Sequence, residues 1–408
     1  MKQARKYISI TLRLVLAVLG IGYIVWTLTW HDQVLIPAGY QFVDGQVAEQ
    51  DMTLRVISDD PDGKLTIEGP GEGELIRLAV PRDTVSADQP RFKPGIGSML
   101  REARWGLLLF GVVLMLPVFP IQGLRWWLLM RCRGIDVPFG RAMRLTMVGL
   151  FFNFCMPGMT GGDVVKAYYA AKGSGKRGVA VMSVVFDRAA GLMGLILLAG
   201  FAGLILMMTG DLDADVRSLV WKVTVLIWAG FFAVLLSAYL FFSMKVRRLV
   251  GFQKLIDRMG PDKIIVRIDD AAGAYRDHRR VILATVLLSL PVHLCQALAT
   301  TCAGWALGMG LSAGLMLTVL PVVFLAGSVP LTYQGLGVME ALAVAMLLPS
   351  PTADANQLVS MLVMIRLFLI LYALVGAVFM LRGDIHLHVQ AEENVEAEES
   401  GQTANTGA

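Results

Sequence analysis

The chain has 408 residues, of which 56% are hydrophobic and 17% are charged, and its mean hydropathy is +0.62. This composition excludes a soluble globular protein of average make-up and predicts a multi-span membrane protein. The formal net charge is +4. The basic residues mostly flank apolar segments, so we expect no nucleic-acid partner.

The first apolar run, from about Leu14 to Trp30, predicts a retained membrane anchor. Lys2, Arg5 and Lys6 precede it, so the positive-inside rule places the N-terminus in the cytoplasm. A cleaved secretory signal is the alternative, but we find no small-residue cleavage site after the run.

Residues 31–99 are then expected outside the cell membrane as a small β-rich insert. Within them, Thr53–Ile57 and Lys64–Glu68 alternate at period two around the turn sequence Asp60-Pro-Asp-Gly63. This pattern is typical of a β-hairpin.

A second span begins at about Trp105, and the sequence Arg125-Trp126-Trp127 near its end indicates an interfacial position for these three side chains. The apolar segment Leu145–Tyr169 follows. It is long enough to cross, but Lys172 and Lys176 come directly after it. A re-entrant hairpin that enters and leaves on the cytoplasmic face keeps those cations inside.

The remaining segments agree with that choice. Two spans, at about Val179–Met208 and Ser218–Phe242, flank an acidic loop and precede a strongly basic one. A further span at about Val281–Trp305 leads to a second broken segment, Leu315–Leu348, and the last span is expected at about Leu358–Leu381.

The predicted fold is therefore an all-α polytopic membrane protein with about six full spans and two re-entrant broken-helix hairpins. The hairpins enter from opposite faces, as in an inverted repeat with its site between the halves. The predicted domains are an anchor (1–30), the exported insert (31–99), the transmembrane domain (100–384) and a disordered acidic cytoplasmic tail (385–408).

Polar residues inside the two broken segments are the candidate site. Bare backbone at membrane depth is tolerated only where it lines a cavity or is buried in protein. We predict no catalytic residue, metal or cofactor, and we expect the following residues to bind substrate: Asn153, Pro157, Gly158, Gly161, Gly162, Asp163, Lys166, Asp187, Arg188, Ser328, Pro330, Gly335, Gly337, Glu340 and Arg366.

Each acid has two interpretations. Thr160 and Asp163 have the spacing of a capping box, and Glu340 stands where a new half-helix should begin, so both acids could serve as helix caps. Alternatively, a half-helix N-terminus with Lys166 one turn on is an anion site that suits a phosphate-bearing headgroup.

The arginines Arg188 and Arg366 lie within apolar spans. An arginine there is costly and is either paired or turned toward a watery cavity. The alternatives are a structural ion pair or snorkelling arginine, and phosphate binding by the guanidinium fork. His293 is expected to be a satisfied interior residue, and the spacing Asp211-Leu-Asp213 to be a solvated turn.

The motif Asn153 to Lys166, then Asp187-Arg188, then Pro330 to Glu340 with Arg366, resembles the lysylphosphatidylglycerol synthase transmembrane-region family of flippase-like membrane proteins. The resemblance covers about Leu124 to Leu381 and implies a helical domain that handles phospholipid or lipid-linked headgroups. No large polar domain follows Leu381, so lysyl transfer itself is not implied.

We therefore expect a multi-pass inner-membrane protein that translocates or presents an anionic phospholipid or lipid-linked headgroup. Membrane lipids are the expected partners, and the sequence does not set the oligomeric state. Two alternatives are an intramembrane transferase that uses Asp163 and Glu340 on a lipid-linked substrate, and a non-catalytic envelope scaffold whose exported insert recruits a partner.

Overall fold

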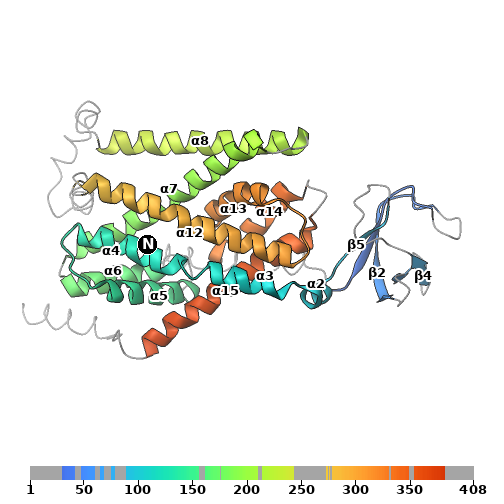
Figure 1. Ribbon diagram of the computed structural model, residues 1–408, viewed down its shortest axis with the longest axis horizontal. Coiled ribbons are helices and arrows are strands. Elements are labelled where there is room, and N and C mark those ends of the chain that lie inside the picture. The colour runs from blue at the N-terminus through green and yellow to red at the C-terminus, as the bar shows by residue number, and fades with distance from the viewer. Residues whose placement is uncertain are drawn as a thin grey trace, which may run out of the picture.

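The computed structural model is a long helical bundle with a small sheet at one end (Figure 1). It describes residues 30–41, 47–59, 65–68, 75–78, 89–155, 161–174, 176–209, 214–242, 273, 275, 278–329, 332–348 and 353–381. The predicted anchor before Trp30 and the predicted acidic tail lie outside these residues.

The sheet has five antiparallel strands in the order β4-β3-β2-β1-β5. Strands β2 and β3 cover the predicted hairpin and pair with each other across a register shift between Val56 and Ser58. One apolar cluster, which includes Val34, Ile36 and Ile67, forms its core. The strands are β1 (Gln33–Ile36), β2 (Met52–Asp59), β3 (Leu65–Glu68), β4 (Leu75–Leu78) and β5 (Arg91–Lys93).

The sheet is fastened to the bundle at two places. Asp32 accepts hydrogen bonds from the Gly95 backbone N–H at 2.6 Å and from the Ser98 hydroxyl at 2.7 Å, which fixes the start of helix α2 (Ile96–Glu102). The Asn356 side-chain amide donates to the Pro94 carbonyl at 2.8 Å. The sheet is thus tied to the first turn of the last helix as well as to α2.

Five helical segments of the described residues are long and apolar enough to cross a membrane, which confirms the multi-span prediction. They correspond to the five predicted spans that lie within the described residues, and they run over Trp105–Arg131, Gly178–Met208, Arg217–Ser237, Arg279–Ala306 and Ala355–Leu381. The helices that contain them are α3 (Trp105–Leu114), α4 (Val118–Arg131), α7 (Arg177–Thr209), α8 (Ala214–Phe242), α12 (Arg279–Ala306) and α15 (Ala355–Leu381).

Four shorter helices occupy the two predicted broken segments. The first helix pair is α5 (Phe139–Cys155) and α6 (Gly161–Ser174), and the second helix pair is α13 (Ala313–Ser328) and α14 (Val338–Leu347). Helix α5 begins earlier than predicted, directly after Pro138. The Pro138 carbonyl accepts hydrogen bonds from the backbone N–H groups of Arg141 and Ala142, which form the first turn of the helix.

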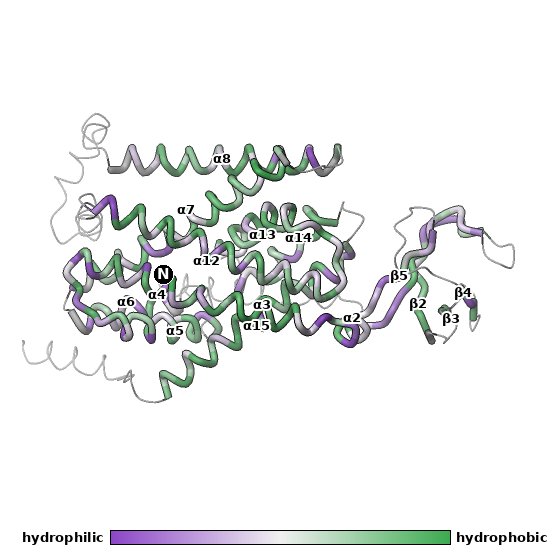
Figure 2. Tube along the Cα trace, in the orientation of Figure 1, coloured by the Kyte–Doolittle hydropathy of each residue, from purple (hydrophilic) through white to green (hydrophobic). Residues whose placement is uncertain are grey.

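The two helix pairs lie toward opposite ends of the bundle. Helices α5 and α6 lie away from the sheet, beside α4, whereas α13 and α14 lie on the sheet side (Figure 1). Hydrophobic residues dominate the lengths of α7, α8 and α15, and hydrophilic residues gather near α2 and at the end of the bundle remote from the sheet (Figure 2). This pattern fits a membrane slab that is perpendicular to the long axis.

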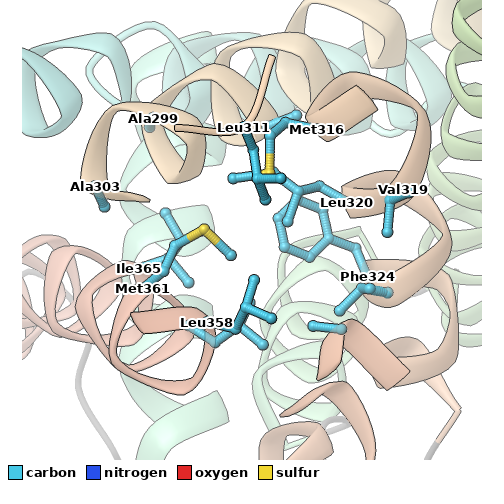
Figure 3. Close-up of a cluster of buried hydrophobic side chains, with 14 of the residues drawn as sticks. Ala299, Ala303, Leu311, Met316, Val319, Leu320, Phe324, Leu358, Met361 and Ile365 are labelled. Carbon is cyan, nitrogen blue, oxygen red and sulfur yellow. The ribbon is translucent and has the colours of Figure 1, made fainter. Parts of the chain in front are cut away.

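The main apolar core surrounds the second helix pair. Leu358, Met361 and Ile365 of α15 face Met316, Leu320 and Phe324 of α13, with Ala299 and Ala303 of α12 closing one side (Figure 3). Small residues permit one close approach to the first pair: a Cβ on Gly376 of α15 would lie 2.1 Å from the Met147 carbonyl oxygen of α5. Helix α15 therefore packs against both pairs.

Candidate functional site

A glycine lets the two helices of the first pair pack closely. A Cβ on Gly162 would lie 1.9 Å from the Gly149 carbonyl oxygen, so only glycine permits α5 and α6 to approach this closely. The Asn153 side-chain oxygen accepts a hydrogen bond from the Gly162 backbone N–H at 2.8 Å. Two residues of the predicted site therefore hold the start of α6, and with it the neighbouring acid, against α5.

That acid, Asp163, lies in the first turn of α6 and forms an ion pair with Arg188 of α7. The Arg188 Nε donates to the Asp163 carboxylate. Both side chains reach the molecular surface, with exposed fractions of 19% for Asp163 and 37% for Arg188. The carboxylate complements the helix dipole and also holds a guanidinium at a partly open position.

Asp187 has a different role from its neighbour Arg188. It is buried, and its carboxylate pairs with Arg125 Nε at 2.6 Å and with Lys166 Nζ at 3.9 Å. The Arg125 Nη1 also donates to the Ser289 hydroxyl at 2.8 Å. This buried triad of Arg125, Lys166 and Asp187 ties α6 to α4, α7 and α12.

The triad corrects the prediction that Arg125 and Trp126 are interfacial. Both are buried, Lys166 Nζ lies 5.2 Å from the centre of the Trp126 ring, and the Trp126 indole N–H donates to the Ser183 hydroxyl at 3.1 Å. The prediction was wrong because Asp187 supplies a buried counter-charge that a local reading of α4 does not reveal. Arginine in a spanning helix is tolerated when paired in this way.

The second helix pair is joined by a turn with unusual backbone angles. Gln334, Gly335 and Gly337 have φ of 54°, 68° and 81°, in the left-handed region that favours glycine. A Cβ on Gly335 would lie 2.8 Å from the Gly327 Cα, so this turn also needs close approach. The predicted glycines thus shape the entry to α14.

Glu340, in the first turn of α14, is a helix cap, as one of the two interpretations predicted, and also forms an ion pair. One carboxylate oxygen accepts from the Gly337 backbone N–H at 2.8 Å, which completes a cap. The other pairs with Arg366 Nη1 of α15. Glu340 is fully buried and the Arg366 side chain is 12% exposed, so this pair is closed off from the surface.

The turn of the second helix pair meets the end of α5. The Gln334 side-chain amide of this turn donates to the carbonyl oxygen of Asn153, in the last turn of α5, at 2.9 Å. Asn153 was predicted as a site residue, whereas Gln334 was not. Gln334 carries no charge, and its positive φ, which is uncommon for a residue other than glycine, is visible only in the structure.

Other predicted residues have simpler places. The Ser328 hydroxyl donates to the Leu325 carbonyl within α13, and Gly161 begins α6. Pro157, Gly158 and Pro330 lie outside the described residues, as does the Asp211 to Asp213 stretch. Within the described residues, no three of the side chains that favour metals gather into a cluster.

His293, expected to be satisfied in the interior, is satisfied in part. Its Nε2 lies 2.9 Å from the Gly191 carbonyl oxygen, while its Nδ1 is buried and finds no hydrogen-bond partner in the part of the chain that is described. The Arg125 guanidinium lies beside Gly191, where an added Cβ would be 3.3 Å from Nη1. His293 therefore borders the buried triad.

These features define a multi-pass helical membrane protein in which two meeting helix pairs each set an acid against an arginine. The chain belongs to the lysylphosphatidylglycerol synthase transmembrane-region family, whose model matches residues 95–376. This match confirms the family resemblance and identifies an integral membrane protein related to lipid handling. No curated protein and no solved structure matches the chain significantly.

Proposed function

We propose that this protein moves an anionic phospholipid or lipid-linked headgroup between the leaflets of the inner membrane. The observation that carries the proposal is the pair of arginine–carboxylate contacts, Asp163 with Arg188 and Glu340 with Arg366, on two helix pairs that a hydrogen bond joins at the end of α5. Charged groups in spanning segments are costly and typically mark the path of a substrate.

The arginines suit a phosphate-bearing headgroup. A guanidinium offers a planar fork of donors that matches phosphate in two-point contact. Arg188 is 37% exposed, and a phosphate that approaches it competes with the Asp163 carboxylate. The released Asp163 remains at the start of α6, where the helix dipole favours its charge.

The lengths of the four short helices support re-entrant hairpins. Helices α5, α6, α13 and α14 contain 17, 14, 16 and 10 residues. At a rise of 1.5 Å per residue they are roughly 15 to 26 Å long, less than the hydrocarbon core of about 30 Å. Two such pairs entering from opposite faces would form an inverted repeat with a site at mid-membrane.

The distribution of cations supports an orientation. Basic residues cluster at the end remote from the sheet, where α4 ends, α5 begins and α12 begins; they include Arg131, Arg133, Arg141, Arg144, Arg279 and Arg280. The positive-inside rule favours that end as cytoplasmic. Residues 31–99 would then be exported, and both termini would be cytoplasmic.

Reconstitution tests the proposal. The purified chain is placed in vesicles that contain fluorescent phosphatidylglycerol, and an impermeant reductant reports the fraction of label in the outer leaflet over time. We expect faster leaflet exchange than in empty vesicles. No acceleration with phosphatidylglycerol or with a second anionic lipid, phosphatidic acid, would overturn the proposal.

Matched variants make the test specific. Arg188→Gln and Arg366→Gln each remove a guanidinium that would bind the headgroup phosphate. Such a charge-assisted contact is worth about 1.5 to 3 kcal/mol, so exchange should fall roughly 10-fold to 100-fold. Arg217→Gln is the control, because this exposed arginine lies at the start of α8. Equal losses in all three variants would point to charge in general and not to these sites.

The alternatives give different results in the same material. An intramembrane transferase would change the composition of the extracted lipids, and Asp163→Asn would abolish that change. A scaffold would keep its cellular function in Asp163→Asn, Arg188→Gln and Glu340→Gln, and would lose it on deletion of residues 35–95.

A further inference from the structure

The two halves of the bundle repeat one arrangement. In each half a short helix carries an acid in its first turn, Asp163 in α6 and Glu340 in α14, and the next long helix carries the partner arginine. The arginine follows the acid by 25 positions in the first half and by 26 in the second. The two ion pairs therefore occupy equivalent places in the two halves.

The equivalent pairs differ in exposure. The side chains of Asp163 and Arg188 are 19% and 37% exposed, whereas those of Glu340 and Arg366 are 0% and 12% exposed. The turn before α14 is closed as well: Thr332 is 8% exposed, and its hydroxyl finds no hydrogen-bond partner among the residues that the structure describes. A buried hydroxyl without a partner is costly, and that cost is avoided if this turn opens.

From this contrast we propose that the two ion pairs act as alternating locks: in each state one pair is accessible and the other is buried. This structure is the state with the first half open, its pair accessible, and the second half closed, its pair buried. The inference rests on the proposed transport function. In the open half a headgroup phosphate takes the place of the carboxylate on Arg188. In the opposite state the Asp163–Arg188 pair, formed but partly exposed here, becomes buried, and Arg366 becomes the accessible guanidinium.

The contact between the second turn and α5 couples the two locks. Gln334 of this turn is hydrogen-bonded to Asn153 in the last turn of α5, so the second turn cannot move away without breaking this bond. The left-handed angles of Gln334, Gly335 and Gly337 identify the segment that can absorb the change, as hinge residues do. The buried triad of Arg125, Lys166 and Asp187 meanwhile holds α6 on its neighbours.

A permanent structural pair is the competing explanation for the burial of Glu340 and Arg366. In that case the second turn stays closed in every state, and weakening the pair loosens α14 without any effect on the first half. Alternating locks predict opposite changes in the two halves, because one equilibrium governs both. Accessibility measured in both halves at once separates the explanations.

The experiment uses two cysteine reporters in the full chain, in vesicles. Cys155, at the end of α5, is exposed and reports the first half; Thr332→Cys introduces a buried thiol that reports the second. Cys132, Cys295 and Cys302 are replaced by alanine. The rate of labelling with a water-soluble maleimide is then measured at each reporter, alone and with Glu340→Gln.

In the parent we expect fast labelling at Cys155 and slow labelling at residue 332. Glu340→Gln weakens the second lock, so labelling at residue 332 should accelerate about 10-fold while labelling at Cys155 slows, as a shift between two states requires. Asp163→Asn should leave residue 332 slow. Asp354→Asn, which loses a contact of 3.8 Å with Lys93 at the sheet junction, is the charge-matched control and should match the parent.

Faster labelling at residue 332 with no change at Cys155, or slow labelling at residue 332 in every variant, would overturn the proposal. If Glu340→Gln does not survive purification, Arg366→Lys replaces it, since it keeps the charge and loses the fork. Labelling needs no lipid movement, so a negative transport assay and a negative labelling result remain separate findings.

Discussion

The first helix pair holds its acid against an arginine at a partly exposed position and is steadied by three further buried charges. The second holds an equivalent pair beside the main apolar core, with two glycines and a left-handed glutamine shaping the turn. The same electrostatic contact is thus supported by charge in one half and by packing in the other. We infer that only the contact itself is common to both, and that its surroundings set how readily it opens.

The most direct test of the contrast between the two ion pairs is to neutralise each acid in turn, which should also give the largest effect. Glu340→Gln leaves Arg366 buried without its counter-charge, and loss of one partner of a buried pair costs about 3 to 5 kcal/mol. Asp163→Asn affects a partly exposed pair and should cost about 1 kcal/mol or less. Thermal stability of the purified protein in detergent measures both, and equal losses would contradict the contrast.

The next test concerns the close approach within the first pair. Gly162→Ala places a Cβ 1.9 Å from the Gly149 carbonyl oxygen, which is backbone and cannot rotate away. Overpacking of this kind costs about 1 to 3 kcal/mol. Gly140→Ala on α5 is the control, because a Cβ there meets nothing within 4 Å, and it should be neutral or stabilising. Unchanged melting of Gly162→Ala would show that α5 and α6 are loosely packed.

A third test concerns the contacts that join the sheet to the bundle, because the second helix pair lies on the sheet side. Asp32→Ala removes two hydrogen bonds to a charged acceptor, a class worth about 1.5 to 3 kcal/mol each. We expect faster proteolysis near Gly95 with little change in the melting of the bundle. Asp51→Ala, which loses one bond to the Ala38 N–H inside the exposed part of the sheet, should not accelerate cleavage at that site.

The smallest expected effect is at the contact between the second turn and the end of α5. Gln334→Ala removes one amide-to-carbonyl hydrogen bond, which in membrane proteins averages about 0.6 kcal/mol. Gln357→Ala removes a similar bond to the Leu307 carbonyl at 3.0 Å. The two variants should melt alike, but only Gln334→Ala should change the rate of leaflet exchange. Identical exchange rates in the two variants would show that the contact of Gln334 with α5 does not couple the two helix pairs.

The long helices and the β-hairpin could be predicted because their signals are local. Apolar runs of spanning length identify α7, α12 and α15, and period-two alternation identifies β2 and β3. The polar breaks in two apolar segments also identified both acids, Asp163 and Glu340. Polar backbone and charge inside such a segment are tolerated only where they line a cavity or are buried in protein.

The partners of the charged residues could not be predicted from sequence. Asp187 and Arg188 are neighbours in the chain, but successive side chains on a helix point about 100° apart, so one meets Arg125 and the other meets Asp163. Arg125 lies far from both in sequence and looked interfacial beside two tryptophans. Gln334 carried no charge or motif, and its contact with Asn153 spans 181 positions.

The double fastening of the sheet has a mechanical consequence. The sheet is pinned to α2 through Asp32 and to the first turn of α15 through Asn356, and α15 is the helix that bears Arg366 and packs on both helix pairs. A displacement of the sheet would therefore strain the start of the same helix that holds the arginine of the second ion pair.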